Sequence, residues 1–113
     1  MKKLEIITRP EQLVVLKEIL TAHDCNGMTI FSVMGCGTQR GLAGLIRRLA
    51  TSMNLITKMQ INAVVADEKL EPLLVDIHGK LATGRIGDGK VFIYDVADAM
   101  RIRTAERGVC AIH

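Results

Sequence analysis

The chain has 113 residues, a formal net charge of +3 and a hydrophobic content of 49%, values that predict one folded domain and exclude an intrinsically disordered chain. The absence of Trp, with one Tyr and two Phe, leaves few aromatic side chains for stacking on bases, and an odd count of three Cys argues against a disulfide framework. With no run near the roughly 18 apolar residues of a membrane span, we expect a reduced, cytoplasmic protein.

The first third of the chain predicts a strand, a helix and a second strand. Residues 2–8 (KKLEIIT) alternate and are rich in Ile, which is typical of a strand. Pro10 suits the first position of a helix, and a turn at 23–27 leads to a strand at 28–34. The expected helix has apolar residues at helical spacing: Leu13, Leu16, Ile19 and Leu20.

The last two thirds repeat this order of elements. A strand is expected at 59–66, followed by a helix that Asp67 caps and that ends near Leu81. Pro72 lies about one turn into that helix, so we expect it to start late or irregularly. A fourth strand is expected at 90–96.

Two strand–helix–strand units predict an α+β fold, the ferredoxin-like double βαβ sandwich. It has one four-stranded antiparallel sheet with both helices on one face, as a single domain over 1–113 with a protruding loop at about 37–57. The uncovered face of the sheet is expected to be apolar and to self-associate. The residues expected on that face include Ile61, Ala63, Val65, Phe92 and Tyr94.

A glycine-rich turn followed by cations suggests an anion site. TGRIGDGK (83–90) sets Gly87 and Gly89 where backbone amides can approach phosphate oxygens, and it ends in Lys90. Arg101 and Arg103, two apart on an expected extended segment, would project to the same side. By spacing alone, the glycine turn is also typical of a hairpin connection.

The middle of the chain is a positive island that favours an anionic ligand or surface. No acidic residue lies between Asp24 and Asp67, whereas four cations do: Arg40, Arg47, Arg48 and Lys58.

Within this island, apolar residues at intervals of three and four predict a helix over part of 42–53. The helix would bury its stripe on a target protein or on its own assembly, with an anionic membrane surface as a third choice. The expected partner-binding residues are Leu42, Leu45, Ile46, Arg47, Arg48, Leu49 and Met53.

Catalytic and metal patterns are absent from the sequence. His23, His78 and His113 are scattered, and no paired carboxylates or Ser/His/Asp set accompany them. We therefore expect a binding protein rather than an enzyme.

Several segments carry a resemblance to a known family: RP before the first helix, GMT (27–29), GCGTQRG (35–41), VVAD (64–67), TGRIGDGKVF (83–92) and RIRTAERG (101–108). Along nearly its whole length the chain resembles the PII nitrogen-regulatory signal-transduction proteins. The resemblance implies a homotrimer with nucleotide sites between subunits that bind ATP or ADP and, with Mg-ATP, 2-oxoglutarate. It also implies a long loop that docks on a membrane transporter, a metabolic enzyme or a regulator.

The resemblance also implies roles for individual residues. The expected nucleotide-binding residues are Thr29, Gly35, Gly37, Thr38, Val64, Gly87, Asp88, Gly89, Lys90, Arg101 and Arg103. Gln39 and Lys58 match positions that serve 2-oxoglutarate or another small anion, and Gln39 would also reach the nucleotide-bound Mg²⁺.

The sequence departs from the family pattern at three places. Thr38 stands where an arginine is usual, and Asn62 replaces an acidic residue. The segment 41–58 has no tyrosine, so the family's common nucleotidylation is chemically impossible there; Thr51 lies near that position, and Ser52 follows it.

The sequence also leaves two other functions open. One is a ferredoxin-like trimer for metal tolerance or small-anion binding without nucleotide sensing. The other is a small RNA-binding domain, which lacks the paired aromatic residues expected on central strands.

Overall fold

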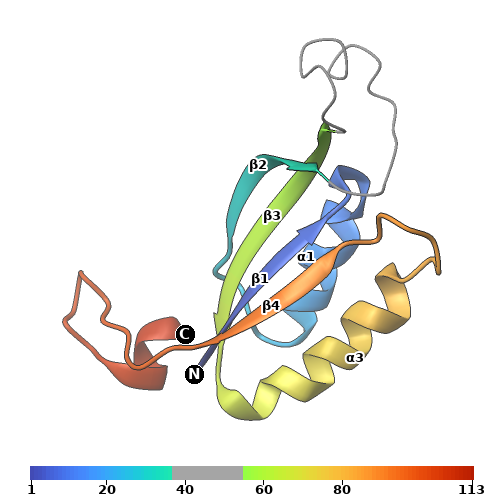
Figure 1. Cartoon of the computed structure of the whole chain (residues 1–113). Helices are drawn as coiled ribbons and strands as arrows, with labels where there is room; N and C mark the ends of the chain where they lie inside the picture. The colour runs from blue at the N-terminus through green and yellow to red at the C-terminus, as the bar shows by residue number, and fades with distance from the viewer. Residues whose placement is uncertain (37–54) are drawn as a thin grey trace.

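A computed structural model describes residues 1–36 and 55–113 (Figure 1). Its strands are β1 (Lys2–Thr8), β2 (Thr29–Cys36), β3 (Leu55–Val65) and β4 (Lys90–Asp95), and its α-helices are α1 (Leu13–Ala22) and α3 (Leu70–Leu81). Short 3₁₀ helices cover Pro10–Gln12, Asp67–Lys69 and Gly108–Ile112.

The four strands form one antiparallel sheet in the order β2-β3-β1-β4. β1 is a central strand, and its Lys2 lies opposite Val65 of β3 and Asp95 of β4. Both helices cover the same face of the sheet (Figure 1). The predicted ferredoxin-like sandwich is therefore confirmed.

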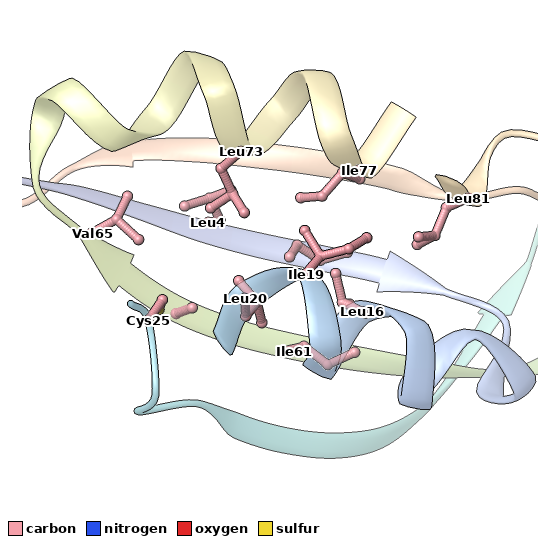
Figure 2. Packing of buried hydrophobic residues seen from close by; sticks show 12 residues of the cluster. Leu4, Leu16, Ile19, Leu20, Cys25, Ile61, Val65, Leu73, Ile77 and Leu81 are labelled. Carbon is pink, nitrogen blue, oxygen red and sulfur yellow. The ribbon is translucent and has the colours of Figure 1, made fainter. Parts of the chain in front are cut away.

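The core lies between this face and the two helices (Figure 2). In β1 the side chains of Leu4 and Ile6 are almost completely buried, because alternation along a strand places both on the helix side. The helices contribute their apolar stripes to the same cluster. The helix residues are Leu16, Ile19 and Leu20 from α1, and Leu73, Ile77 and Leu81 from α3.

Most predicted boundaries are reproduced within a few residues. β1 occupies the predicted 2–8, and Pro10 opens a 3₁₀ turn that continues into α1. Pro72 has the expected effect, since a separate 3₁₀ turn precedes α3. β3 begins at Leu55 rather than residue 59, so the end of the expected loop at 37–57 is strand.

The predicted capping role of Asp67 is wrong. The turn that follows has Ala66 at its N-cap and no side-chain hydrogen bond there. The Asp67 carboxylate instead lies 2.8 Å from the amino group of Met1, a contact between distant residues that holds its pKa below the usual value. A tertiary ion pair has replaced the local cap.

The prediction for the uncovered face of the sheet is partly wrong. Ile61, Ala63 and Val65 are buried under the helices, whereas Phe92 and Tyr94 are about half exposed. Along 59–65 of β3 the even-numbered residues, which include polar side chains, face away from the helices, because alternation places the odd-numbered ones in the core.

A polar network crosses this open face. Glu5 accepts hydrogen bonds at 3.3 Å from both Gln60 Nε2 and Tyr94 Oη, and Gln60 also donates to Asn62 Oδ1 at 3.2 Å. The ammonium of Lys3 lies 5.3 Å from the Tyr94 ring centroid. The open face is therefore a mixed surface with polar side chains at its centre.

Candidate functional site

Residues 82–89, here called the glycine loop, connect α3 to β4 and pass the end of β1 (Figure 1). Gly87 and Gly89 have φ of 101° and 105°, which L-residues rarely adopt. A Cβ at Gly89 would lie 1.9 Å from the carbonyl oxygen of Ile7. Glycine is therefore required for the loop backbone to touch β1.

The Asp88 carboxylate forms hydrogen bonds with the start of the glycine loop. It accepts hydrogen bonds from the Thr83 amide at 2.7 Å, from the Thr83 hydroxyl at 2.5 Å and from the Gly84 amide at 3.1 Å. These bonds, the one from the hydroxyl foremost, hold the pKa of Asp88 below its ordinary 3.8. Asp88 was predicted to contact nucleotide; in this geometry its side chain shapes the loop.

Three consecutive carbonyls of the loop accept hydrogen bonds from side chains of β1, of β3 and of the residue that follows β1. Arg9 Nη2 donates to Ile86 O at 2.9 Å, Lys58 Nζ to Gly87 O at 2.8 Å, and Thr8 Oγ1 to Asp88 O at 2.9 Å. Arg9 Nη1 also lies 3.5 Å from the Asp88 carboxylate. The loop backbone is thus fixed against β1 and β3.

Lys58 is a cation in a largely buried position. Burial, and then the nearby charge of Arg9, lower the pKa of its ammonium below the usual 10.5, while Glu11 and Asp88 oppose that shift. A buried ammonium beside a second cation is a favourable place for an anion.

We expect the amide protons of Thr83 and Gly84 to report the titration of Asp88. A carboxylate with a depressed pKa adds stability above its unfolded-state pKa, and this is lost as the pH falls through the folded-state value. NMR shifts of the two amides should therefore change with a midpoint below pH 3.8. Asp88→Asn should abolish the step and Asp98→Asn should leave it; a midpoint at or above 3.8 would contradict the hydrogen-bond geometry.

A second group of predicted residues lies at the other end of the sheet. Thr29 and Val64 line a cavity of about 970 Å³, together with Asn62 between them and with residues 111–113. Thr29 is six residues from Gly35 along β2, a distance of about 20 Å in a strand. One chain therefore does not bring Thr29 and Gly35 together.

The predicted extended segment at 101–104 is wrong. Residues 102–104 form a turn in which the Ala105 amide donates to Arg101 O at 2.8 Å, and Ala105 has a φ of 62°. Arg101 and Arg103 therefore do not share a side by strand alternation. The positive φ of Ala105 and its hydrogen bond to Arg101 stabilise a turn here, although the sequence alternates as in a strand.

The two arginines of this turn have different surroundings. The Arg101 guanidinium pairs with Glu106 at 2.6 Å and donates to Cys110 O at 2.9 Å and to His113 O. Arg103 is exposed and makes no hydrogen bond or ion pair with residues 1–36 or 55–113. Only Arg103 is immediately available to a ligand.

The predicted site residues thus fall into separate groups within one chain. Gly35, Lys58 and the glycine loop with Lys90 lie at one end of the sheet, and Thr29, Val64 and the two arginines lie toward the other (Figure 1). The remaining predictions, including the helix over 42–53, lie outside the described residues: Gly37, Thr38, Gln39, Leu42, Leu45, Ile46, Arg47, Arg48, Leu49 and Met53.

Two further features of the described residues concern metal ions and membranes. In the part of the chain that the structure describes, no group of three or more His, Cys, Asp or Glu side chains could hold a metal ion. Neither helix in those ranges has the length and hydropathy that crossing a bilayer requires.

Sequence reasoning missed Thr8 and Arg9, which hold the glycine loop. Arg9 was noticed only as part of the RP pair before the first helix. Both donate hydrogen bonds to carbonyls about 80 residues further along the chain. The spacing of residues in the sequence cannot reveal contacts over such a separation.

Comparisons with known proteins agree with this fold. A family model described as Nitrogen regulatory protein P-II matches residues 1–106. The chain is 38% identical over 112 residues to Nitrogen regulatory protein P-II of Rhizobium meliloti (strain 1021), covering 99% of this chain and 100% of that one. It is 40% identical over 112 residues to Nitrogen regulatory protein P-II 2 of Methanothermobacter thermautotrophicus (strain Delta H), covering 99% and 97%.

Two solved structures are also similar. The structure of B. subtilis GlnK has a TM-score of 0.79 and 32% sequence identity, covering 97% of this chain and 96% of that chain. The B. subtilis GlnK-ATP complex has a TM-score of 0.80 and 31% identity, covering 97% and 94%. With a family match over most of its length, relatives at such identity and the fold they share, the chain belongs to the P-II family of nitrogen regulatory proteins.

Proposed function

We propose that the protein is an adenine-nucleotide-sensing signal-transduction regulator of nitrogen or related metabolism. It binds ATP or ADP, and the bound nucleotide controls how the segment at about 37–57 docks on a target protein in the cytoplasm. It works by binding rather than by turnover. A membrane transporter or a metabolic enzyme is the expected class of target.

The glycine loop is the observation that supports this proposal most directly. Gly87 and Gly89 both have positive φ, and Lys90 follows immediately at the start of β4. Backbone amides in such a turn, with a cation beside them, are a suitable cradle for a polyphosphate. A solved relative described as an ATP complex has the same fold.

The nucleotide site is proposed to lie between copies of the chain. β4 separates Lys90 from the turn that holds Arg103, and its six residues span about 17 Å. Figure 1 shows the segment after β4 at the end of the sheet opposite to the glycine loop. A single polyphosphate can meet both cations only if a neighbouring copy supplies one of them, which supports an assembly with shared sites. We propose that this assembly is a homotrimer.

Lys58 suits a second, anionic effector. Its ammonium lies beside the glycine loop and near Arg9, so a carboxylate entering there would gain two cationic neighbours. We propose that 2-oxoglutarate or a similar small anion binds at Lys58, with Gln39 and a nucleotide-bound Mg²⁺ completing the site.

Calorimetry with ATP, ADP and AMP, each repeated with Mg²⁺ and 2-oxoglutarate, tests the proposal. ATP or ADP should bind with a dissociation constant of about 1 μM, which corresponds to roughly 8 kcal/mol. A second heat on adding 2-oxoglutarate only in the presence of Mg-ATP would support the effector site. Lack of affinity for both ATP and ADP would favour a small-anion-binding protein instead.

Arg103→Ala should weaken ATP and ADP binding by about ten- to a hundredfold. The exposed guanidinium would donate charge-assisted hydrogen bonds to phosphate, each worth about 1.5–3 kcal/mol. The same calorimetric titration measures the loss, and size-exclusion chromatography checks that assembly persists. Lys17→Ala removes an equal charge from the exposed face of α1 and should leave affinity unchanged; equal effects of the two variants would refute the role of Arg103.

A further inference from the structure

We propose that Thr8 and Arg9 are positioning residues of the nucleotide site, an inference that rests on the proposed function. They hold the carbonyls of Asp88 and Ile86 toward β1 and thereby fix the direction of the amides that would receive phosphate. Neither residue needs to touch the nucleotide.

The argument starts from the geometry of the peptide unit. In a trans peptide the carbonyl of one residue and the amide of the next point in opposite directions. Arg9, Lys58 and Thr8 hold the carbonyls of residues 86, 87 and 88. The amides of residues 87, 88 and 89 must therefore point away from those three donors.

Within residues 1–36 and 55–113, the amides of Gly87 and Gly89 donate no hydrogen bond, whereas the Asp88 amide closes the turn at 86–87. The sign of φ also alternates across them, since it is positive at Gly87 and Gly89 and not at Asp88. Alternation of this kind turns successive amides into one concavity, which is a nest for an anion. The loop therefore presents the amides of Gly87 and Gly89, for which residues 1–36 and 55–113 supply no acceptor.

The buried position of Thr8 indicates a structural role for its hydroxyl group. Leu4, Ile6 and Thr8 share the helix-facing side of β1, and Thr8 is only 2% exposed. A buried hydroxyl needs a partner, and the one it has is the carbonyl of Asp88 at 2.9 Å. Valine would fill the same space, so the hydroxyl is required for the loop rather than for packing.

Gly89 makes this contact possible. Its missing Cβ lets the loop backbone approach so closely that an added Cβ would lie 2.9 Å from Thr8 Cα. Arg9 directly follows β1, and its guanidinium spans Ile86 O and the Asp88 carboxylate. Donors from the last residue of β1 and from the residue after it therefore set the orientation of two nearby peptides of the loop.

Three variants test the role of Thr8. Thr8→Val removes the donor at nearly constant volume, Thr8→Ser keeps it, and Ile6→Val shortens a neighbouring core side chain without touching a donor. ATP and inorganic tripolyphosphate are the probes: calorimetry for ATP, competition for tripolyphosphate, and NMR for the amide protons of Gly87 and Gly89.

Thr8→Val should weaken ATP and tripolyphosphate by the same factor of about ten, because losing one hydrogen bond is worth about one decade in affinity. It should also reduce the shift of the two amide protons at saturation. Thr8→Ser and Ile6→Val should bind ATP within about twofold of the unaltered protein. If Thr8→Val does not fold, Arg9→Met, at a more exposed position, replaces it with the same expected result.

The opposite outcomes are equally definite. Unchanged ATP affinity in Thr8→Val, no recovery in Thr8→Ser, or an equal loss in Ile6→Val would overturn the positioning role and leave the proposed nucleotide function standing. Failure of the unaltered protein to bind ATP, ADP or tripolyphosphate would overturn both.

Discussion

Replacing Gly89 by alanine is expected to lower the free energy of unfolding by at least about 3 kcal/mol and to abolish ATP binding. The new Cβ would lie 1.9 Å from Ile7 O and 2.9 Å from Ile7 C, at a φ of 105° that alanine disfavours. Ile7 cannot move aside, because it lies opposite Gln60 and Lys90 on the two neighbouring strands. Urea unfolding at matched protein concentration and calorimetry with ATP measure the two losses.

Gly79→Ala is the matched control for this substitution. Gly79 lies within α3, and a Cβ there would meet nothing within 4 Å. Alanine should therefore stabilise the fold by about 0.4–1 kcal/mol, because it restricts the unfolded chain and favours helix. Equal stability of the Gly89→Ala and unaltered proteins would show that the glycine loop does not approach β1 as described.

Leu4→Ala is expected to cost about 2–5 kcal/mol of unfolding free energy. Leu4 is 0% exposed in the central strand β1 and contributes to the core beneath both helices (Figure 2). Its loss leaves a cavity that paired strands on both sides prevent from closing. Because small domains are stable by about 5–15 kcal/mol, the midpoint of urea unfolding should fall clearly.

Val75→Ala separates burial from hydrophobicity in that experiment. Val75 lies on α3 with 69% of its surface exposed, so its truncation should change stability by no more than about 0.5 kcal/mol. A comparable loss from Leu4→Ala and Val75→Ala would contradict the assignment of the core.

Local patterns were sufficient to predict the fold. Alternation followed by Pro10 bounded β1, and apolar spacing placed α1 and α3 with their buried faces. Two strand–helix–strand units then leave few compact arrangements, and the ferredoxin-like sandwich is one of them. These features depend on residues close together in the sequence.

The errors arose where distant residues compete with local rules. Asp67 was predicted to cap a helix, but its carboxylate forms an ion pair with the Met1 amino group. The alternation at 101–104 suggested a strand, yet the backbone turns there around Ala105. Both faces of β3 carry apolar residues, so composition alone did not show which face the helices cover.

The candidate site was predictable only in part for the same reason. The glycines of the loop and Lys90 were found from residue type and order. The donors that hold the loop were not found. Thr8 and Arg9 bind backbone carbonyls, and the residue types at those positions do not indicate such a contact. The contact of His23 with Asp76, 53 residues apart, is another pairing that spacing cannot show.

The central place of β1 has a consequence for synthesis. Its two neighbours are β3 and β4, so its first edge is paired only after Val65 has been made and its second only after Asp95. At about 5–20 residues per second, Leu4 and Ile6 leave the ribosome several seconds before the sheet can enclose them. During that interval the nascent chain presents an unpaired apolar strand, a feature that makes a partly folded chain prone to aggregate.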